Sequence, residues 1–397
     1  MKTMISNGKV ITPFRMIEKG TVVVENGVIV DIAEGDPPRY DSEVRVIDAA
    51  HKFISPGFID MHTHGAGNAE VMDGTVEAIR IMCRTHAEYG TTSIVPTTPA
   101  ARWEDIYRAV DAIREAQQDS RGAHILGVHL EGPYCSAAEK GAQNPSFIKN
   151  PDPNEYLKIL DYWEGIKIMS VAPELDGGLQ LGRELRKRGI LAAIAHSNAN
   201  YEQVVRALEN GYTHITHFYS GCSMTHRENA YRIAGVVESG YLLDELSVEI
   251  IADGRHLPAS LLKLIFKVKG AGSTALVTDS TKFAGLPPEE LKDIKTRDGM
   301  EIIYEDEVIK LKDRSCFAGS VATTNRLVRN MVRLADVPLL QAVEMASYTP
   351  ARILGVDRNK GSLAVGKDAD ILVFDENIGI ALTMVQGKIV FQQDRRD

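Results

Sequence analysis

The feature that most constrains the fold is an alternation of short apolar runs with amphipathic stretches along the middle of the chain. Most gaps between the runs carry apolar residues at helical spacing, as at 201–208 and 259–268. Alternating strands and helices predict a parallel sheet, and eight such units predict a (β/α)8 barrel. The strand-like runs lie at 58–61, 92–95, 124–130, 166–171, 191–195, 213–216, 248–252 and 275–278.

A six-stranded open sheet is the alternative for such an alternation. It would need a glycine-rich dinucleotide-binding turn after its first strand, and the sequence has none there. Residues 300–312 predict a hairpin inserted after the eighth strand. Two helices, near 323–335 and 338–347, are expected to close the barrel.

The two ends of the chain resemble each other in composition and differ from the middle. Asn7-Gly8 and Asn26-Gly27 are dipeptides typical of hairpin turns, and apolar runs flank the second of them. We therefore expect an α/β protein in which residues 1–52 and 356–397 form a small β-sandwich domain. The barrel, residues 53–355, would be inserted between them.

Composition excludes several classes of function. The chain has 397 residues, a net charge of −9 and a pI of about 5.7, which disfavours binding to nucleic acid or anionic lipid. No apolar run approaches the ~20 residues of a membrane span, and the first residues lack a signal-peptide apolar core. The four cysteines follow no disulfide or zinc-ribbon spacing. We expect a cytoplasmic protein with reduced thiols.

Metal-ligating residue types follow several of the predicted strands. His62 and His64 end the first strand, and side chains two residues apart on a strand point the same way. Reactive groups of such barrels gather at the C-terminal ends of the strands. A single polar residue there is more often structural, but six at one mouth predict a site for Zn²⁺ or a similar ion. The six are His62, His64, Glu131, His196, His217 and Asp279.

The motifs that carry these residues identify a family. They are Pro-Gly-Phe-Ile-Asp-x-His-x-His-Gly, His-Leu-Glu-Gly-Pro, Thr-His, Ala-Asp-Gly-x-His and Thr-Asp. With them the chain resembles the amidohydrolase superfamily and, within it, the N-acetylglucosamine-6-phosphate deacetylases, over nearly its whole length. The resemblance implies hydrolysis of the acetamide of an N-acetylated amino sugar phosphate by an enzyme with one or two divalent metal ions per chain. Zinc is the first candidate.

The resemblance also implies roles for the six residues. Glu131, His196 and His217 would hold the main metal ion. His62 and His64 would belong to a second position, which Glu131 also reaches.

Asp279 would be the catalytic acid and base. Zinc lowers the pKa of its bound water to about 7, so a hydroxide can attack the acetyl carbonyl. Asp279 would take the water proton and return it to the leaving amine. The alternative is that Asp279 only orders a ligand histidine.

Substrate contacts follow from the same resemblance. The family binds the sugar phosphate partly through backbone N–H groups after the sixth strand, here at Ser220 and Gly221. An arginine and a histidine that match Arg227 and His256 reach the phosphate across a dimer interface, so we expect a homodimer. The alternative for Arg227 is an ordinary solvated loop residue.

Two departures from the family leave the substrate open. The family has Asn-Ala beside the sixth-strand ligand, where this chain has Ser220-Gly221. It has a histidine that contacts the acetyl carbonyl where this chain has Gln143. The galacto epimer and other N-acyl or cyclic amide substrates therefore stay open. Cyclic-amide hydrolases of the superfamily use a carboxylated lysine at the end of the fourth strand, and strand 166–171 has no lysine at its end. A non-catalytic scaffold would be expected to lose ligands, but all six candidate residues are present.

Overall fold

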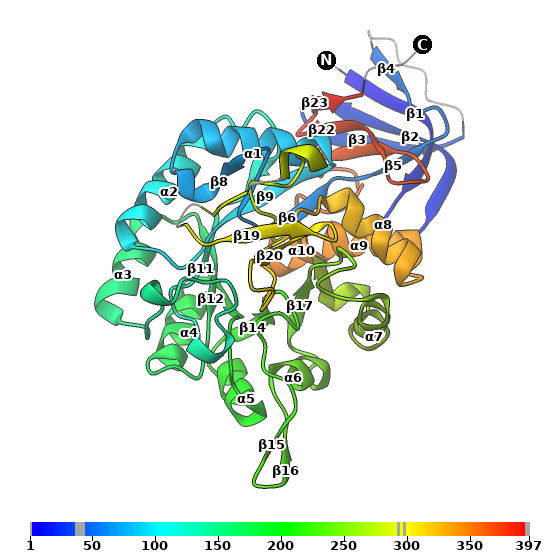
Figure 1. The fold of residues 1–397 in the computed structure, drawn as a ribbon. Helices are drawn as coiled ribbons and strands as arrows, with labels where there is room; N and C mark the ends of the chain where they lie inside the picture. The colour runs from blue at the N-terminus through cyan, green and yellow to red at the C-terminus, as the bar shows by residue number, and fades with distance from the viewer. Residues whose placement is uncertain (1, 36–43, 292–293, 297–298, 394–397) are drawn as a thin grey trace.

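Eight parallel strands form the predicted barrel in the computed structural model, which describes residues 2–35, 44–291, 294–296 and 299–393 (Figure 1). Their hydrogen-bonded order follows the chain, so each unit lies beside the next. The predicted strand 124–130 is split into β10 (His124–Ile125) and β11, because the backbone departs from strand geometry at Gly127 (φ 153°). The barrel strands are β6 (Phe58–Thr63), β9 (Thr91–Thr98), β11 (Val128–Glu131), β12 (Ile166–Val171), β13 (Leu191–Ile194), β14 (Tyr212–Ile215), β17 (Ser247–Ile250) and β18 (Thr274–Leu276).

The last strand meets the first through a mixture of backbone and side-chain bonds. The N–H of Asp279, just after β18, donates to the carbonyl of His62 at 2.9 Å. The Thr278 hydroxyl donates to the buried Asp60 carboxylate at 2.6 Å. The first and last strands of the barrel are therefore joined beside His62 and Asp279, two of the candidate site residues.

Helices cover the outside of the barrel and bury their apolar faces against it (Figure 1). A smaller apolar cluster, which includes Met61, Val95 and Ile168, fills the inside. Both predicted closing helices are present, as α8 and α9. The helices are α1 (Val76–Glu88), α2 (Trp103–Ala116), α3 (Pro153–Tyr162), α4 (Gly178–Lys187), α5 (Tyr201–Glu209), α6 (Val236–Leu242), α7 (Ala259–Lys269), α8 (Thr324–Leu334), α9 (Leu339–Ala346) and α10 (Tyr348–Ile353).

Small strand pairs interrupt the barrel. The predicted hairpin is confirmed as β19 (Ile302–Glu305) and β20 (Val308–Leu311). Glu307 in its turn accepts hydrogen bonds from Arg255 and Arg326 at 3.2 Å, which tie the hairpin to the barrel. A second hairpin, β15 (His226–Glu228) and β16 (Tyr231–Ile233), projects away from the barrel (Figure 1). β7 (Gly65–Ala66) pairs with β8 (Ala69–Glu70).

Both ends of the chain pair into one β domain, as predicted, and its strands form a single sheet. Its order is β23-β22-β21-β5-β1-β2-β3, and β4 pairs with β1. The two ends meet where β5 and β21 pair antiparallel, and their apolar side chains form a core cluster of their own. The strands are β1 (Lys2–Ile11), β2 (Met16–Glu25), β3 (Val28–Glu34), β4 (Val44–Asp48), β5 (Phe53–Pro56), β21 (Ile371–Phe374), β22 (Ile380–Val385) and β23 (Lys388–Gln392).

One of the two turn predictions is wrong. Asn26-Gly27 joins β2 to β3 as a two-residue turn, with φ of 52° and 82°. Asn7-Gly8 instead lies inside β1, where the register against β2 shifts and Asn7 has a φ of 58°. Asn-Gly suits any position that needs a positive φ, and a bulge is one of these.

The division of the chain at residues 52 and 356 stays a proposal. The strand pairing favours a first boundary between β5, which lies in the terminal sheet, and β6, which lies in the barrel. Among the described residues, no helix has the length and apolar composition needed to cross a membrane.

Candidate metal centre

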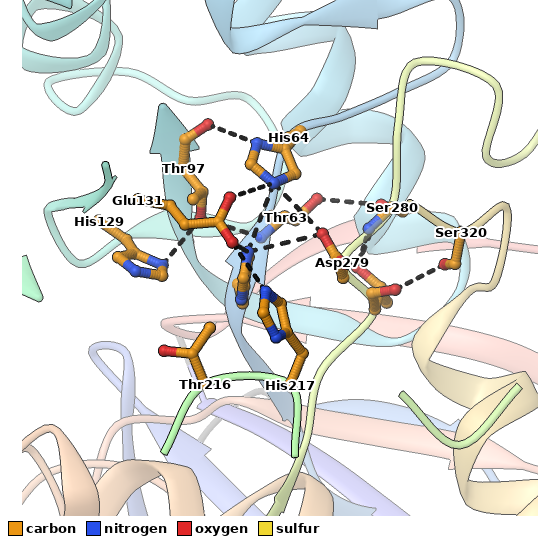
Figure 2. Close-up of polar contacts among 12 residues, drawn as sticks. Thr63, His64, Thr97, His129, Glu131, Thr216, His217, Asp279, Ser280 and Ser320 are labelled. Atoms are coloured by element: carbon orange, nitrogen blue, oxygen red, sulfur yellow. Dashed lines mark hydrogen bonds and ion pairs between the residues drawn. The ribbon is translucent and has the colours of Figure 1, made fainter. Parts of the chain in front are cut away.

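The six candidate residues come together at the C-terminal mouth of the barrel. His62 and His64, at the end of β6, bring their Nε2 atoms to 3.4 Å from each other. Glu131, at the end of β11, lies between His64 and His217 (Figure 2). Its Oε2 is 3.3 Å from His64 Nε2, and its Oε1 is 3.7 Å from His62 Nε2.

The same Glu131 carboxylate faces a second pair of imidazoles. Its Oε1 is 3.1 Å from His196 Nε2 and 2.9 Å from His217 Nε2. Two groups of possible metal ligands therefore share one carboxylate, and within each group the ligand atoms lie within 4.8 Å of one another. The groups are His62, His64 and Glu131, and Glu131, His196 and His217.

The other ring nitrogen of each histidine faces an acceptor. His64, His196 and His217 direct Nδ1 at the backbone carbonyls of Thr97 (3.1 Å), Glu139 (2.9 Å) and Ser220 (2.9 Å) respectively. His62 Nδ1 instead faces a carboxylate. With the proton on Nδ1, each Nε2 presents its lone pair to the centre, which is the form that binds a metal. Nitrogen and carboxylate donors in this arrangement fit a divalent ion such as zinc.

Electrostatics also favours a cation at this place. Burial opposes a charged imidazole, but hydrogen bonds to Asp279 and Glu131 raise the pKa of His64 to about 9. Burial likewise opposes ionisation of Glu131, yet the attraction of His62 and hydrogen bonds from neighbouring imidazoles hold its pKa well below the usual range. Carboxylates concentrated in a buried space therefore attract positive charge.

Backbone geometry turns three of the side chains into the mouth. His196, His217 and Asp279 have φ of 45°, 27° and 45°, in a region that residues other than glycine seldom adopt. Each lies within three residues of the last residue of its strand. Such strained positions concentrate at functional sites, and sequence patterns alone give no sign of them.

Asp279 lies against the centre and also faces the cavity. Its Oδ1 is 3.2 Å from His64 Nε2 and 3.5 Å from His62 Nε2. Burial opposes its ionisation, but the attraction of His62 and His64 lowers its pKa below the usual range. An ionised carboxylate therefore lies beside the two imidazoles.

Gln143 is held within the centre by two bonds. Its Oε1 accepts from the Ala100 N–H at 2.8 Å, which fixes the orientation of the amide. Its Nε2 then donates to Glu131 Oε2 at 2.9 Å. The predicted contact with an acetyl group stays a prediction, but Gln143 also has a role in holding Glu131.

Ser220 and Gly221 line the same cavity. The Ser220 N–H already donates to the carbonyl of His217 at 2.9 Å, so that donor is engaged within the loop. Gly221 has a φ of 56°, and a Cβ there would lie 2.8 Å from His196 Nδ1. Glycine is therefore required for the loop to approach the histidine.

His256 and Arg227, predicted as a pair, lie apart within one chain. His256 lines the cavity, and Asp253 accepts from its Nδ1 at 2.8 Å. Arg227 is exposed on β15, in the hairpin that projects from the barrel.

The cavity above the centre has a volume of about 1060 Å³. Its floor carries His64, Glu131, His196, His217 and Asp279, and residues around the β19–β20 hairpin, such as Phe317 and Arg314, form part of its wall. A hexose phosphate would fit in this space.

Sequence reasoning missed Glu249, on β17. Its carboxylate is 1% exposed and lies 2.5 Å from His62 Nδ1. The signal was a charged residue inside the otherwise apolar run 248–252, because a buried carboxylate must have partners.

The chain is similar in sequence to known enzymes. Residues 53–390 match the Amidohydrolase family. An N-acetylglucosamine-6-phosphate deacetylase of Vibrio furnissii is 34% identical over 93% of this chain and 90% of that protein. An N-acetylgalactosamine-6-phosphate deacetylase of Escherichia coli O157:H7 is 31% identical over 87% of this chain and 90% of that protein.

Solved structures give the same result. The N-acetylglucosamine-6-phosphate deacetylase of Pasteurella multocida has a TM-score of 0.90 at 28% identity and covers 98% of this chain and 99% of its own. A mutant of the Mycobacterium smegmatis enzyme, in complex with N-acetyl-D-glucosamine-6-phosphate, has a TM-score of 0.88 at 27% identity and covers 99% of both chains. The chain therefore belongs to the amidohydrolase family and, within it, to the group of N-acetylglucosamine-6-phosphate deacetylases.

Proposed function

We propose that the protein hydrolyses the acetamide of N-acetylglucosamine 6-phosphate to acetate and glucosamine 6-phosphate. One observation carries the proposal: two groups of imidazoles share the Glu131 carboxylate, beside Asp279, at the floor of a cavity. A hydrolase of an unactivated amide needs a strong nucleophile and a polarised carbonyl, and this set of groups is suited to both.

The chain's own residues would divide the work as follows. A divalent ion, which we propose to be zinc at one or two positions per chain, would polarise the acetyl carbonyl and lower the pKa of a water molecule. Glu131, His196 and His217 would hold it, and His62 and His64 with Glu131 would hold the second. Asp279 would accept the proton of the attacking water and donate it to the amine nitrogen as the C–N bond breaks. The water oxygen would end in acetate.

Phosphate recognition is proposed to use two subunits. His256, oriented by Asp253, faces the cavity from within the chain. Arg227 stands exposed on a projecting hairpin, where it can enter the site of a second copy, and its planar guanidinium suits a bidentate contact with phosphate. We therefore propose a homodimer. We also place it in the cytoplasm, a proposal supported by its four unpaired cysteines.

The galacto epimer is the second candidate substrate. The amide of Gln143 stands where the family has an imidazole, and the relative from Escherichia coli O157:H7 is named for the galacto sugar. An enzyme of this shape could accept either epimer at the sugar position.

A panel of N-acetyl sugars tests the proposal. Acetate release would be measured from the gluco and galacto epimers, each with and without the 6-phosphate. We expect turnover of a 6-phosphate and at least a tenfold lower kcat/KM without it. Glu131→Ala should reduce both the metal content and kcat, because Glu131 belongs to both ligand groups. A protein that binds metal but releases no acetate from any of the four would contradict the proposal.

A further inference from the structure

Glu249 belongs to a strand that contributes no candidate ligand, yet it contacts both ligand groups. Its Oε1 accepts from His62 Nδ1 at 2.5 Å and from the backbone N–H of His217 at 3.1 Å. Its Oε2 faces His214 Nε2 at 3.2 Å. A buried carboxylate with these partners is fixed in place by the protein itself.

His62 is the one histidine of the centre whose Nδ1 faces a carboxylate. The other three donate to backbone carbonyls, which orient a ring but carry no charge. A bond to a carboxylate is roughly twice as strong as one between neutral groups and makes the opposite ring nitrogen a better ligand. His62 is therefore held more firmly in its metal-binding form than His196 or His217.

The support of Glu249 does not depend on a metal ion. His214 lies between Glu249 and Ser247: its Nε2 faces the carboxylate, and its Nδ1 is 2.8 Å from the Ser247 hydroxyl, which donates to the Thr213 carbonyl at 3.2 Å. His214, Ser247 and Glu249 all lie on β14 or β17, neighbouring strands of the barrel. The carboxylate is thus positioned before any ion enters.

We propose that Glu249 is a positioning residue that gives the His62, His64 and Glu131 group its affinity for a second metal ion. The inference rests on the proposed metal-dependent function. Under this proposal, the Glu249 carboxylate distinguishes the metal position of His62 from the position of His196 and His217. In the Glu131, His196 and His217 group, backbone carbonyls face the Nδ1 atoms instead, and Glu249 touches this group only through the backbone N–H of His217, a bond that the amide oxygen of a glutamine can also accept.

The test measures metal binding and not turnover. Zinc would be titrated into metal-free protein against a chelator of known affinity, with metal content checked by elemental analysis. His62→Ala and His196→Ala would identify which binding step belongs to which group. In Glu249→Gln, which keeps the shape but loses the charge, the step assigned to His62 should weaken about 10- to 100-fold while the other step changes little. Glu245→Gln makes the same change of charge at an exposed residue just before the same strand, so it is the control and should leave both steps unchanged.

Several outcomes would overturn the inference. Equal weakening of both steps, or no weakening, would show that Glu249 does not act on His62 alone. A wild-type protein that binds one ion would also overturn it, while acetate release by that protein would leave the proposed function standing. If Glu249→Gln does not fold, Glu249→Asp keeps the charge but withdraws it by one methylene, and the same weakening is expected.

Discussion

Gln143 shows that a residue can serve the centre through another side chain. It connects the Ala100 backbone to Glu131, the carboxylate on which four imidazoles converge. Because Glu131 belongs to both ligand groups, a residue that holds Glu131 in place affects both metal positions.

Gln143→Leu should therefore lower metal retention and kcat together, by about tenfold or more, since outer hydrogen bonds to ligands have that effect. Metal content after dialysis and steady-state kinetics on the best substrate of the panel would measure this. Gln143→His is the matched variant, because it restores the residue that the family carries. An unchanged metal content in Gln143→Leu with a reduced kcat would instead favour direct contact with the acetyl group.

His86 provides a pH prediction at the same scale. It lies on α1, buried, with Nε2 2.9 Å from the Thr63 hydroxyl, and burial lowers its pKa to about 4. An unfolded chain takes up this proton near pH 6.5, so folding stability should fall as the pH drops from about 6.5 to about 4. The loss amounts to about 3 kcal/mol.

The measurement is urea unfolding across this pH range for the wild type and His86→Gln. The pKa of Asp60, raised to about 7 by burial, shifts stability in the opposite sense in both proteins, so the difference between them is the relevant quantity. As the pH falls, the free energy of unfolding of the wild type should decrease relative to that of His86→Gln. A difference that does not change with pH would show that His86 has the same pKa in the folded and the unfolded state.

At the scale of elements, we predict that the β15–β16 hairpin contributes to the site of a second copy of the chain. Most of its residues are exposed in a single chain, including Tyr231 at 76%, and it holds Arg227 away from the cavity of its own barrel. An element with this shape is expected to complete a neighbouring site.

Mixed dimers test this. Asp279→Asn and Arg227→Ala chains should each be weakly active alone, the first through lost proton transfer and the second through weakened phosphate binding. In a heterodimer, one of the two sites combines an intact Asp279 with an intact Arg227 from the other chain. Heterodimers should therefore recover up to half of the wild-type kcat, with a KM near that of the wild type. Verified heterodimers that show no recovery would indicate that each site is built from one chain.

The elements also show what the sequence could predict. Periodicity located all eight barrel strands, because alternation of apolar runs is a local property. It missed the break at Gly127 and misplaced the Asn7-Gly8 turn, since both depend on how a neighbouring strand is paired. The six ligand-type residues were found from their place after the strands. The positive φ at His196 and the bond from His62 to Glu249 depend on three-dimensional contacts that no local pattern records.

At the scale of the whole molecule, a buried ion pair supports the junction of barrel and terminal sheet. Lys360, 5% exposed, bonds to Asp370 at 2.7 Å and to Asp368 at 2.8 Å. Asp370 lies just before β21 and accepts from the Gln386 N–H at 2.8 Å. These contacts therefore fix the segment that connects α10 to β21 and join it to the turn before β23.

Lys360→Met should lower the free energy of unfolding by about 3–5 kcal/mol, because it leaves the buried Asp370 carboxylate without a cation. Denaturant unfolding would measure the change. Lys312→Met is the control, because its partner Glu301, 2.8 Å away, lies at the exposed surface and the loss should be much smaller. Adding Asp370→Asn to Lys360→Met should recover part of the loss. Equal effects of Lys360→Met and Lys312→Met would contradict the role of burial.

The pairing of β5 with β21 has a consequence for synthesis of the protein. β5 leaves the ribosome early, while the strand that covers its edge is made only after the entire barrel. At ~5–20 residues per second, the interval is about 15–60 s. During that time the nascent chain exposes an unpaired apolar strand edge, which is prone to aggregation. Chains that stop short of β21 should therefore be clients of chaperones or proteases, even when every residue of the metal centre has been made.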